Sequence, residues 1–103
     1  MKAAIEGFRY DTDRAYLVGE HDAYGGSAQS TEDMHHWRAG LYVTPRARRY
    51  FLAGEGGSLT RFCPPGQARG YKIIPLTEAQ AFEWAQRYLH YKTVAEHFPN
   101  HIS

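Results

Sequence analysis

The pattern that most constrains the fold is a strict alternation in residues 37–44, which read WRAGLYVT. Successive side chains of a β-strand point to opposite faces, so a period of two predicts a half-buried strand. The turn sequence TPRAR and a second apolar run, RYFLAG, come next. These features predict a hairpin as the centre of the fold. Its buried face is expected to carry the apolar residues at every second position: Trp37, Ala39, Leu41 and Val43.

Two more pairs of sequence features predict strands on either side of this hairpin. Residues 3–10 are rich in aromatic and β-branched side chains and end at Asp-Thr-Asp, a turn sequence. Residues 14–20 follow at once, which predicts a first hairpin with its tip at residues 11–13. Residues 71–75 resemble a last short strand that ends at Pro75.

The C-terminal part of the chain has helical periodicity. Thr77 with Gln80 three residues later forms a capping-box pattern, and the apolar positions that follow recur at helical spacing. Several strands followed by a helix, with no βαβ alternation, predict an α+β fold. We expect a single domain over residues 1–103, with an antiparallel sheet of four to five strands and one C-terminal helix packed on a face.

Composition excludes several classes of protein. The formal net charge is only +1, which does not indicate a polyanion binder as a whole. The single cysteine, Cys63, cannot form an internal disulfide, and no CxxC or CxxH pair indicates zinc. No apolar run is long enough for a membrane span. We therefore expect a soluble, cytoplasmic protein without a cofactor, a bound metal or a membrane partner.

The segment GEGG, residues 54–57, raises the question of a chemical site. It lacks the Lys-Ser/Thr of a P-loop and the following helix of a dinucleotide turn. The preferred interpretation is a strand end that needs glycine for a positive φ or for close backbone approach. A phosphate nest lined by these glycines and Ser58 stays open as an alternative. Glu55 has no catalytic partner nearby in sequence, and nothing around Cys63 indicates an activated thiol.

Charge is segregated along the chain. Residues 1–36 contain seven acidic and three basic residues, whereas residues 37–72 contain seven basic residues and one acidic residue. Ordinary solvated turn charge explains this layout, and so does contact with a charged partner. Arginine suits partner contact because its planar group binds phosphate or carboxylate bidentately. The candidate partner-binding residues are three in the central turn and four in the acidic segment: Arg46, Arg48, Arg49, Asp22, Tyr24, Glu32 and Asp33.

Four segments together resemble a family of small proteins carried by phages, plasmids and other mobile elements. They are GFRYDTDRA (7–15), WRAGLYVT (37–44), YFLAGEGG (50–57) and IIPLTEAQAFEWA (73–85). The chain departs from the family pattern in TPRARRY and after Tyr91. The resemblance implies no catalytic residues. It implies a small host-directed protein similar to anti-CRISPR inhibitors, which act by stoichiometric binding.

The sequence therefore predicts a non-enzymatic binding protein, most concretely an anti-CRISPR protein in a bacterial host cell. Its expected partner is a host protein or ribonucleoprotein, a CRISPR effector complex, whose nucleic-acid or nuclease recruitment it blocks. The alternative is a small regulatory module that binds nucleic acid directly through the basic 46–49 hairpin. A third reading is an enzyme with a site near Glu55, Ser58 and Cys63. The chain is expected to be a monomer or a homodimer paired through a sheet edge.

Overall fold

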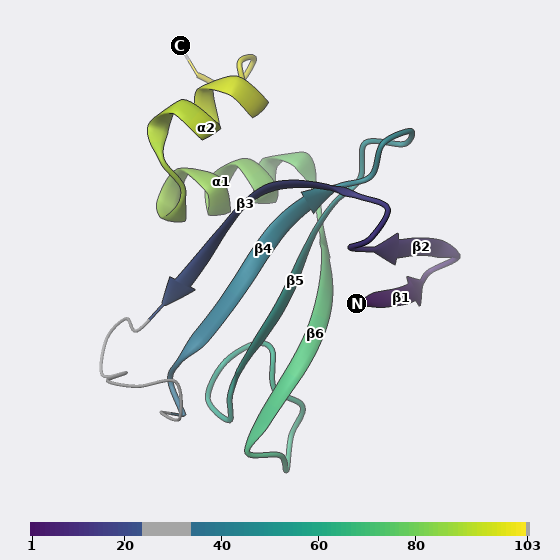
Figure 1. Ribbon diagram of the computed structural model, residues 1–103, viewed down its shortest axis with the longest axis vertical. Helices are drawn as coiled ribbons and strands as arrows, with labels where there is room; N and C mark the ends of the chain where they lie inside the picture. Colours follow the sequence, from purple (N-terminus) through teal and green to yellow (C-terminus); the bar gives the residue numbers. More distant parts are fainter. Residues whose placement is uncertain (24–33, 103) are drawn as a thin grey trace.

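The structure, a computed structural model, describes residues 1–23 and 34–102. Four antiparallel strands form the main sheet in the order β3-β4-β5-β6, as Figure 1 shows. They are β3 (Tyr16–Ala23), β4 (Trp37–Val43), β5 (Tyr50–Gly57) and β6 (Arg69–Leu76). The predicted α+β class and the central β4–β5 hairpin are confirmed, with Leu41 opposite Leu52 in the register.

The N-terminal hairpin differs from the prediction. β1 (Lys2–Ile5) pairs with β2 (Phe8–Asp11) in a separate two-stranded sheet, and β3 pairs with β4 instead. The turn lies at Glu6 and Gly7, whose φ angles are 52° and 81°. Two consecutive positive φ values belong to the two-residue turns that match the twist of paired strands. The chain does turn after Asp11, where the Arg14 amide donates to the Asp11 carbonyl at 3.1 Å. The predicted hairpin across residues 11–13 is nevertheless wrong, because the tight turn at Glu6 and Gly7 divides the segment expected to be one strand, and β2 does not pair with β3.

Two short helices follow the sheet. α1 (Glu78–Tyr88) begins at Thr77, whose hydroxyl accepts from the Gln80 amide at 3.1 Å while the Gln80 side chain accepts from the Thr77 amide at 2.9 Å. This capping box confirms the predicted start. α2 (Tyr91–His97) was not predicted, and His90 caps it by accepting from the Lys92 amide at 3.1 Å. In the described part of the chain, neither helix has the length and apolarity to cross a membrane.

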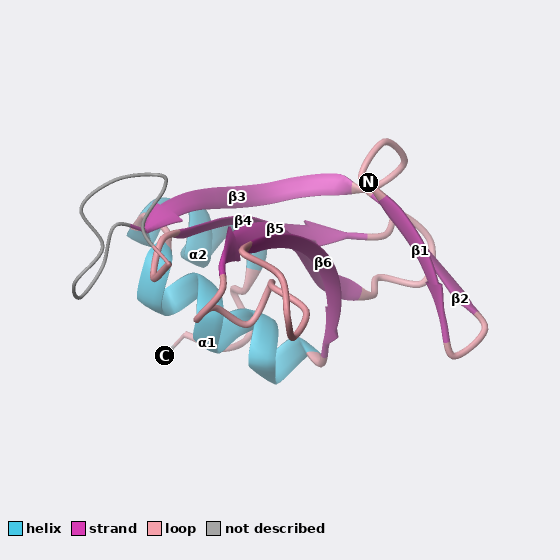
Figure 2. Cartoon of the chain, turned by 90° about the horizontal axis from the view of Figure 1, so that it is seen from below, coloured by secondary structure: helices cyan, strands magenta, loops and turns pink. Residues whose placement is uncertain are grey.

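The main apolar cluster lies between one sheet face and the helices. Figure 2 shows both helices on the same side of the sheet. Leu41 and Leu52 of the sheet are fully buried in this cluster, together with Trp84 of α1 and Phe98, which follows α2. The alternation predicted for residues 37–44 is therefore confirmed, since Ala39, Leu41 and Val43 are buried in this cluster and Trp37, partly buried, packs against it.

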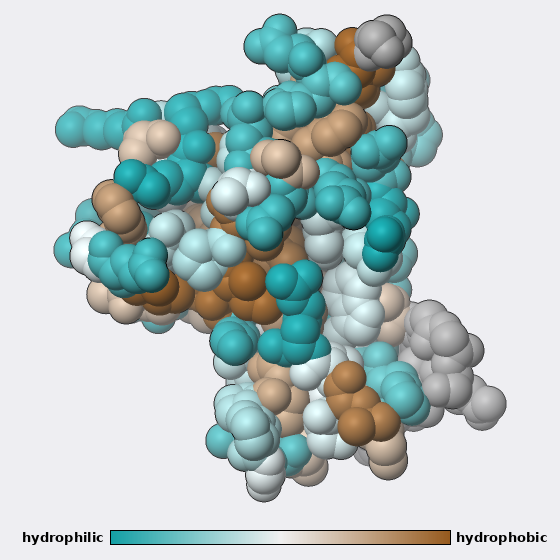
Figure 3. All heavy atoms as spheres, turned by 180° about the vertical axis from the view of Figure 1, so that it is seen from behind, coloured by the Kyte–Doolittle hydropathy of each residue, from teal (hydrophilic) through white to brown (hydrophobic). Residues whose placement is uncertain are grey.

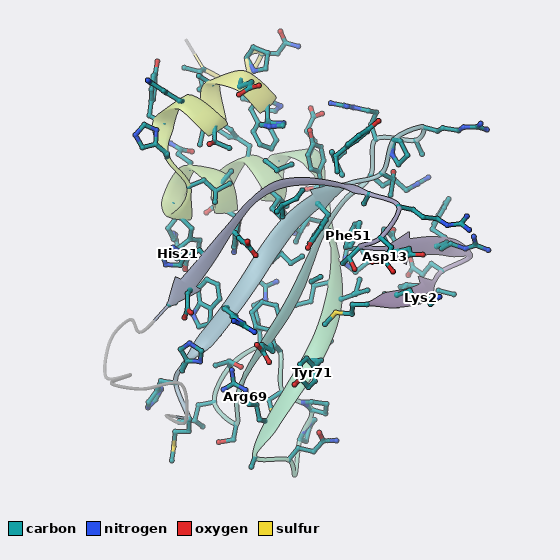
Figure 4. All side chains as sticks on the ribbon, viewed as in Figure 1. Lys2, Asp13, His21, Phe51, Arg69 and Tyr71 are labelled. Atoms are coloured by element: carbon teal, nitrogen blue, oxygen red, sulfur yellow. The ribbon has the colours of Figure 1, made fainter. Side chains whose placement is uncertain are left out.

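Within residues 1–23 and 34–102, the opposite face of the sheet is covered at one end only. There the ring of Tyr10, from β2, packs edge-on against Phe51 with centroids 5.3 Å apart, and Ile73 completes a second buried cluster. In Figure 4, Phe51 lies beside the β1–β2 hairpin, whereas Arg69 and Tyr71 lie toward the other end of β6. We call the remainder of this side the open face; Asp22, Arg38, Glu55 and Tyr71 lie across it in register.

Candidate functional site

The GEGG segment is the end of β5, and its glycines are required by close packing. A Cβ on Gly54 would lie 2.6 Å from Cε1 of Phe62 and 2.8 Å from Cβ of Ala39. A Cβ on Gly57 would lie 2.6 Å from the Cα of Met34. Neither residue has a positive φ. Of the two reasons offered for glycine, a positive φ or close approach, only close approach therefore applies to Gly54 and Gly57.

The phosphate-nest alternative does not fit this geometry. The whole segment is paired with β6, and residues 54–56 are also paired with β4. The amide of Gly57 donates to the carbonyl of His36 at 2.9 Å. A nest needs successive amides that point together into a concavity, whereas extended strand amides alternate in direction and are used by the ladder.

Glu55 projects onto the open face, where two arginines neutralise it. Its carboxylate accepts a short hydrogen bond from Nε of Arg38, and Nε of Arg69 lies 3.7 Å from its other oxygen. The hydrogen bond and the charge of Glu55 raise the pKa of Arg38. Sequence reasoning missed these partners because they come from β4 and β6, many residues away.

His36 joins a second carboxylate to the same group. Its side chain is 1% exposed, and Nε2 lies 2.6 Å from an oxygen of Asp22 while Nδ1 lies 3.2 Å from a guanidinium nitrogen of Arg69. A guanidinium can only donate, so Nδ1 accepts and Nε2 carries the hydrogen donated to Asp22. The pattern His-His gave no sign that one ring would be fully enclosed.

Asp22, Arg38 and Glu55 of this group line a groove of about 660 Å³ on the open face. Its base is formed by small residues, Gly40 and Ala53, and Tyr71 is 67% exposed at its side. Tyr42 also lines the groove, and its pKa is raised by burial first and then by Glu20 and Asp13. The groove is polar, but Glu55 and Asp22 are both engaged with cations or with His36.

A second candidate surface lies at the opposite end of the molecule. The β4–β5 loop is closed by hydrogen bonds between Thr44 and Arg49, at 3.0 Å between backbones and 2.9 Å from the Arg49 amide to the threonine hydroxyl. The guanidinium of Arg49 lies 3.5 Å from the centre of the Phe8 ring, in cation–π geometry. Arg49 thus fixes the loop against β2, and the two sides enclose a cleft.

This arginine cleft has a volume of about 270 Å³, and four arginines line it against one carboxylate. The arginines are Arg9, Arg14, Arg46 and Arg49, and the carboxylate is Asp11. Asp11 is 9% exposed, and Nε of Arg14 lies 3.9 Å from its oxygen. Within residues 1–23 and 34–102, Arg9, Arg46 and the neighbouring Arg48 form no ion pair. The cleft therefore combines arginines from residues 1–36, a net acidic region of the sequence, with arginines from residues 37–72, a net basic region.

The remaining predicted site residues lie away from the arginine cleft or outside the described residues. Tyr24, Glu32 and Asp33 lie outside the described residues, so their part in the prediction is not addressed. Asp22 is described, and it contacts His36 at the end of the sheet where β4 begins, whereas the arginine cleft lies beyond the end of β4. Ser58 is exposed, and the thiol of Cys63 lies 3.3 Å from the carbonyl of Gln67. Among the described contacts, none joins Glu55 to Ser58 or to Cys63. No group of three metal-ligating side chains occurs in the described residues.

Comparisons with protein-family models, with curated proteins and with solved structures find no match to this chain.

Proposed function

We propose that this chain is a non-enzymatic binding protein of mobile-element origin, an anti-CRISPR inhibitor that docks on a CRISPR effector complex through the arginine cleft. The observation that carries the docking surface is the set of four arginines around one carboxylate. The effector and the mobile-element origin rest on the sequence resemblance alone.

The cleft suits an acidic surface because its cations are exposed and are largely without counter-charges. Arg46 and Arg48 extend from a loop whose ends are hydrogen-bonded, so less conformational freedom is lost on binding than in an open loop. Arginine is the cation that most often anchors interfaces. The partner surface would present carboxylates or phosphates at the spacing of the loop.

The open-face groove favours binding over catalysis. An Asp–His pair resembles part of a catalytic triad, but the nitrogen of His36 that would face a nucleophile is bonded to Arg69. The carboxylate of Glu55 lies between the guanidiniums of Arg38 and Arg69, so both of its oxygens are already engaged by side chains of the protein. These contacts tie Asp22, His36 and Glu55 to neighbouring strands of the sheet.

Gel filtration with purified effector complexes tests the proposal. The wild-type chain should co-elute with one complex, and Arg46→Ala/Arg48→Ala should weaken that association at least tenfold. Lys72→Ala/Lys92→Ala removes the same charge from exposed positions outside the cleft and should bind as the wild type does. The absence of co-elution with every complex would remove the inhibitor proposal.

Direct binding of nucleic acid is the second candidate, and Arg9 and Arg14 favour it by widening the basic surface beyond the 46–49 loop. If about four phosphates are neutralised, log K should fall with log salt at a slope of about −3 to −4. A gel shift across salt concentrations measures this slope. Binding to DNA or RNA alone with that slope selects this candidate, and no shift at low salt excludes it.

A further inference from the structure

A separate pocket lies on the helix side of the molecule, between α1 and the loop that joins β5 to β6. Its volume is about 580 Å³, within the range of about 300–1,000 Å³ that is usual for small-molecule sites. Figure 3 views the molecule from this side, and apolar atoms gather across its middle between polar borders. The pocket shares no residue with the arginine cleft.

The floor of this pocket is aromatic and is lined by Trp37, Phe62, Trp84 and Tyr88. Phe62 and Trp84 are 1% and 7% exposed, so Trp37 and Tyr88, which are half-buried, are the rings that a ligand can reach. Tyr88 is in ring contact with both tryptophans, at centroid distances of 5.0 Å to Trp37 and 5.2 Å to Trp84. Flat π surfaces of this kind favour stacking with a planar ring, and they accept any nucleobase because every base has a π face.

The rim supplies polar groups suited to an anion. Arg61 from the loop and Arg87 from α1 are both exposed, and in residues 1–23 and 34–102 neither forms an ion pair. The Gln80 carbonyl oxygen is engaged with the Thr77 amide, which leaves its NH₂ group as a donor. Glu83 is an acceptor on the same rim.

We propose that this pocket binds a nucleoside monophosphate, either free or as one unit of a single-stranded nucleic acid. The base stacks on the aromatic floor, and the phosphate accepts from Arg61 and Arg87. Glu83 accepts from a ribose hydroxyl or an exocyclic amine. An apolar side chain of a partner protein would use the floor alone and would cover the two arginines without supplying a counter-charge, which is unfavourable.

Tryptophan fluorescence gives a direct test, because both tryptophans of the chain line the pocket. Titration with AMP, corrected with free tryptophan for absorption by the ligand, should give saturable quenching. Adenosine and inorganic phosphate, each carrying half of the recognised group, should bind at least tenfold more weakly. Titration with an adenylate hexanucleotide tests whether the pocket binds a nucleotide that is one unit of a single-stranded nucleic acid. Binding of the hexanucleotide without AMP supports the single-strand form of the proposal, and binding of neither overturns it.

Variants test the role of the rim independently of the arginine cleft. Arg61→Ala and Arg87→Ala should each lower AMP affinity about tenfold or more, which is the usual effect of losing a hydrogen bond to a charged group. Both side chains are exposed, so urea unfolding should be close to that of the wild type. Arg46→Ala, in the cleft, should bind AMP normally. Wild-type affinity in both rim variants, or equal affinity for adenosine and AMP, would contradict the proposal.

Discussion

Replacing Gly54 by alanine tests whether close packing is the reason why the GEGG segment needs glycine at this position. The added methyl would lie 2.6 Å from a Phe62 ring carbon and 2.8 Å from Cβ of Ala39. Phe62 is 1% exposed and Ala39 is 4% exposed, so neither can move into solvent. Overpacking of this kind costs about 2–3 kcal/mol. Alanine recovers about 0.5–1 kcal/mol of chain entropy relative to glycine. The net loss should be about 1–2 kcal/mol.

Urea unfolding measures this loss, and the midpoint should fall by about 1 M at an unchanged m-value. Phe62→Leu provides the matched control, because leucine removes the ring carbons that the new methyl meets. The double variant should be more stable than the two single losses predict, by about 1 kcal/mol in a double-mutant cycle. A Gly54→Ala variant as stable as the wild type, or strictly additive losses, would refute the packing explanation.

Four further substitutions test the open face by urea unfolding. Glu55→Gln should cost about 1–2 kcal/mol, because it leaves Arg38 and Arg69 without their shared counter-charge. Arg38→Ala, at an exposed position, should cost less than Glu55→Gln, and equal losses would contradict this. His36→Phe keeps the ring but removes both polar contacts, and should cost about 1–2 kcal/mol; no loss would show that these contacts are incidental. Burial and nearby carboxylates raise the pKa of Tyr42 above 10.0, so its contribution to stability is complete below pH 10 and is lost as pH rises through the raised value. Tyr42→Phe cannot ionise and should lose less stability in this alkaline range; parallel pH profiles would contradict the assignment.

The central hairpin and α1 could be predicted because their signals are local. Alternation fixes which side of β4 is buried, and the Thr77 capping box fixes where α1 begins. The first hairpin could not be placed by the same rules. Its turn contains Glu at a positive φ before Gly7, and glutamate is a weaker turn signal than asparagine or aspartate.

The candidate surfaces depended on contacts that sequence order hides. Arg46, Arg48 and Arg49 could be found from their clustering, but Arg9 joins them only because β2 folds beside the β4–β5 loop. The sequence indicates no partner for Glu55, because both of its arginines belong to other strands. Sheet register decides such pairings, and no single-sequence pattern encodes which charges become neighbours.

The most direct test of the binding account is the affinity of the full chain for a CRISPR effector complex with and without the exposed loop arginines. Gel filtration should show one complex that retains the wild-type chain and Lys72→Ala/Lys92→Ala but releases Arg46→Ala/Arg48→Ala. Retention of Arg46→Ala/Arg48→Ala at wild-type strength, or the absence of any retained complex, would contradict the account.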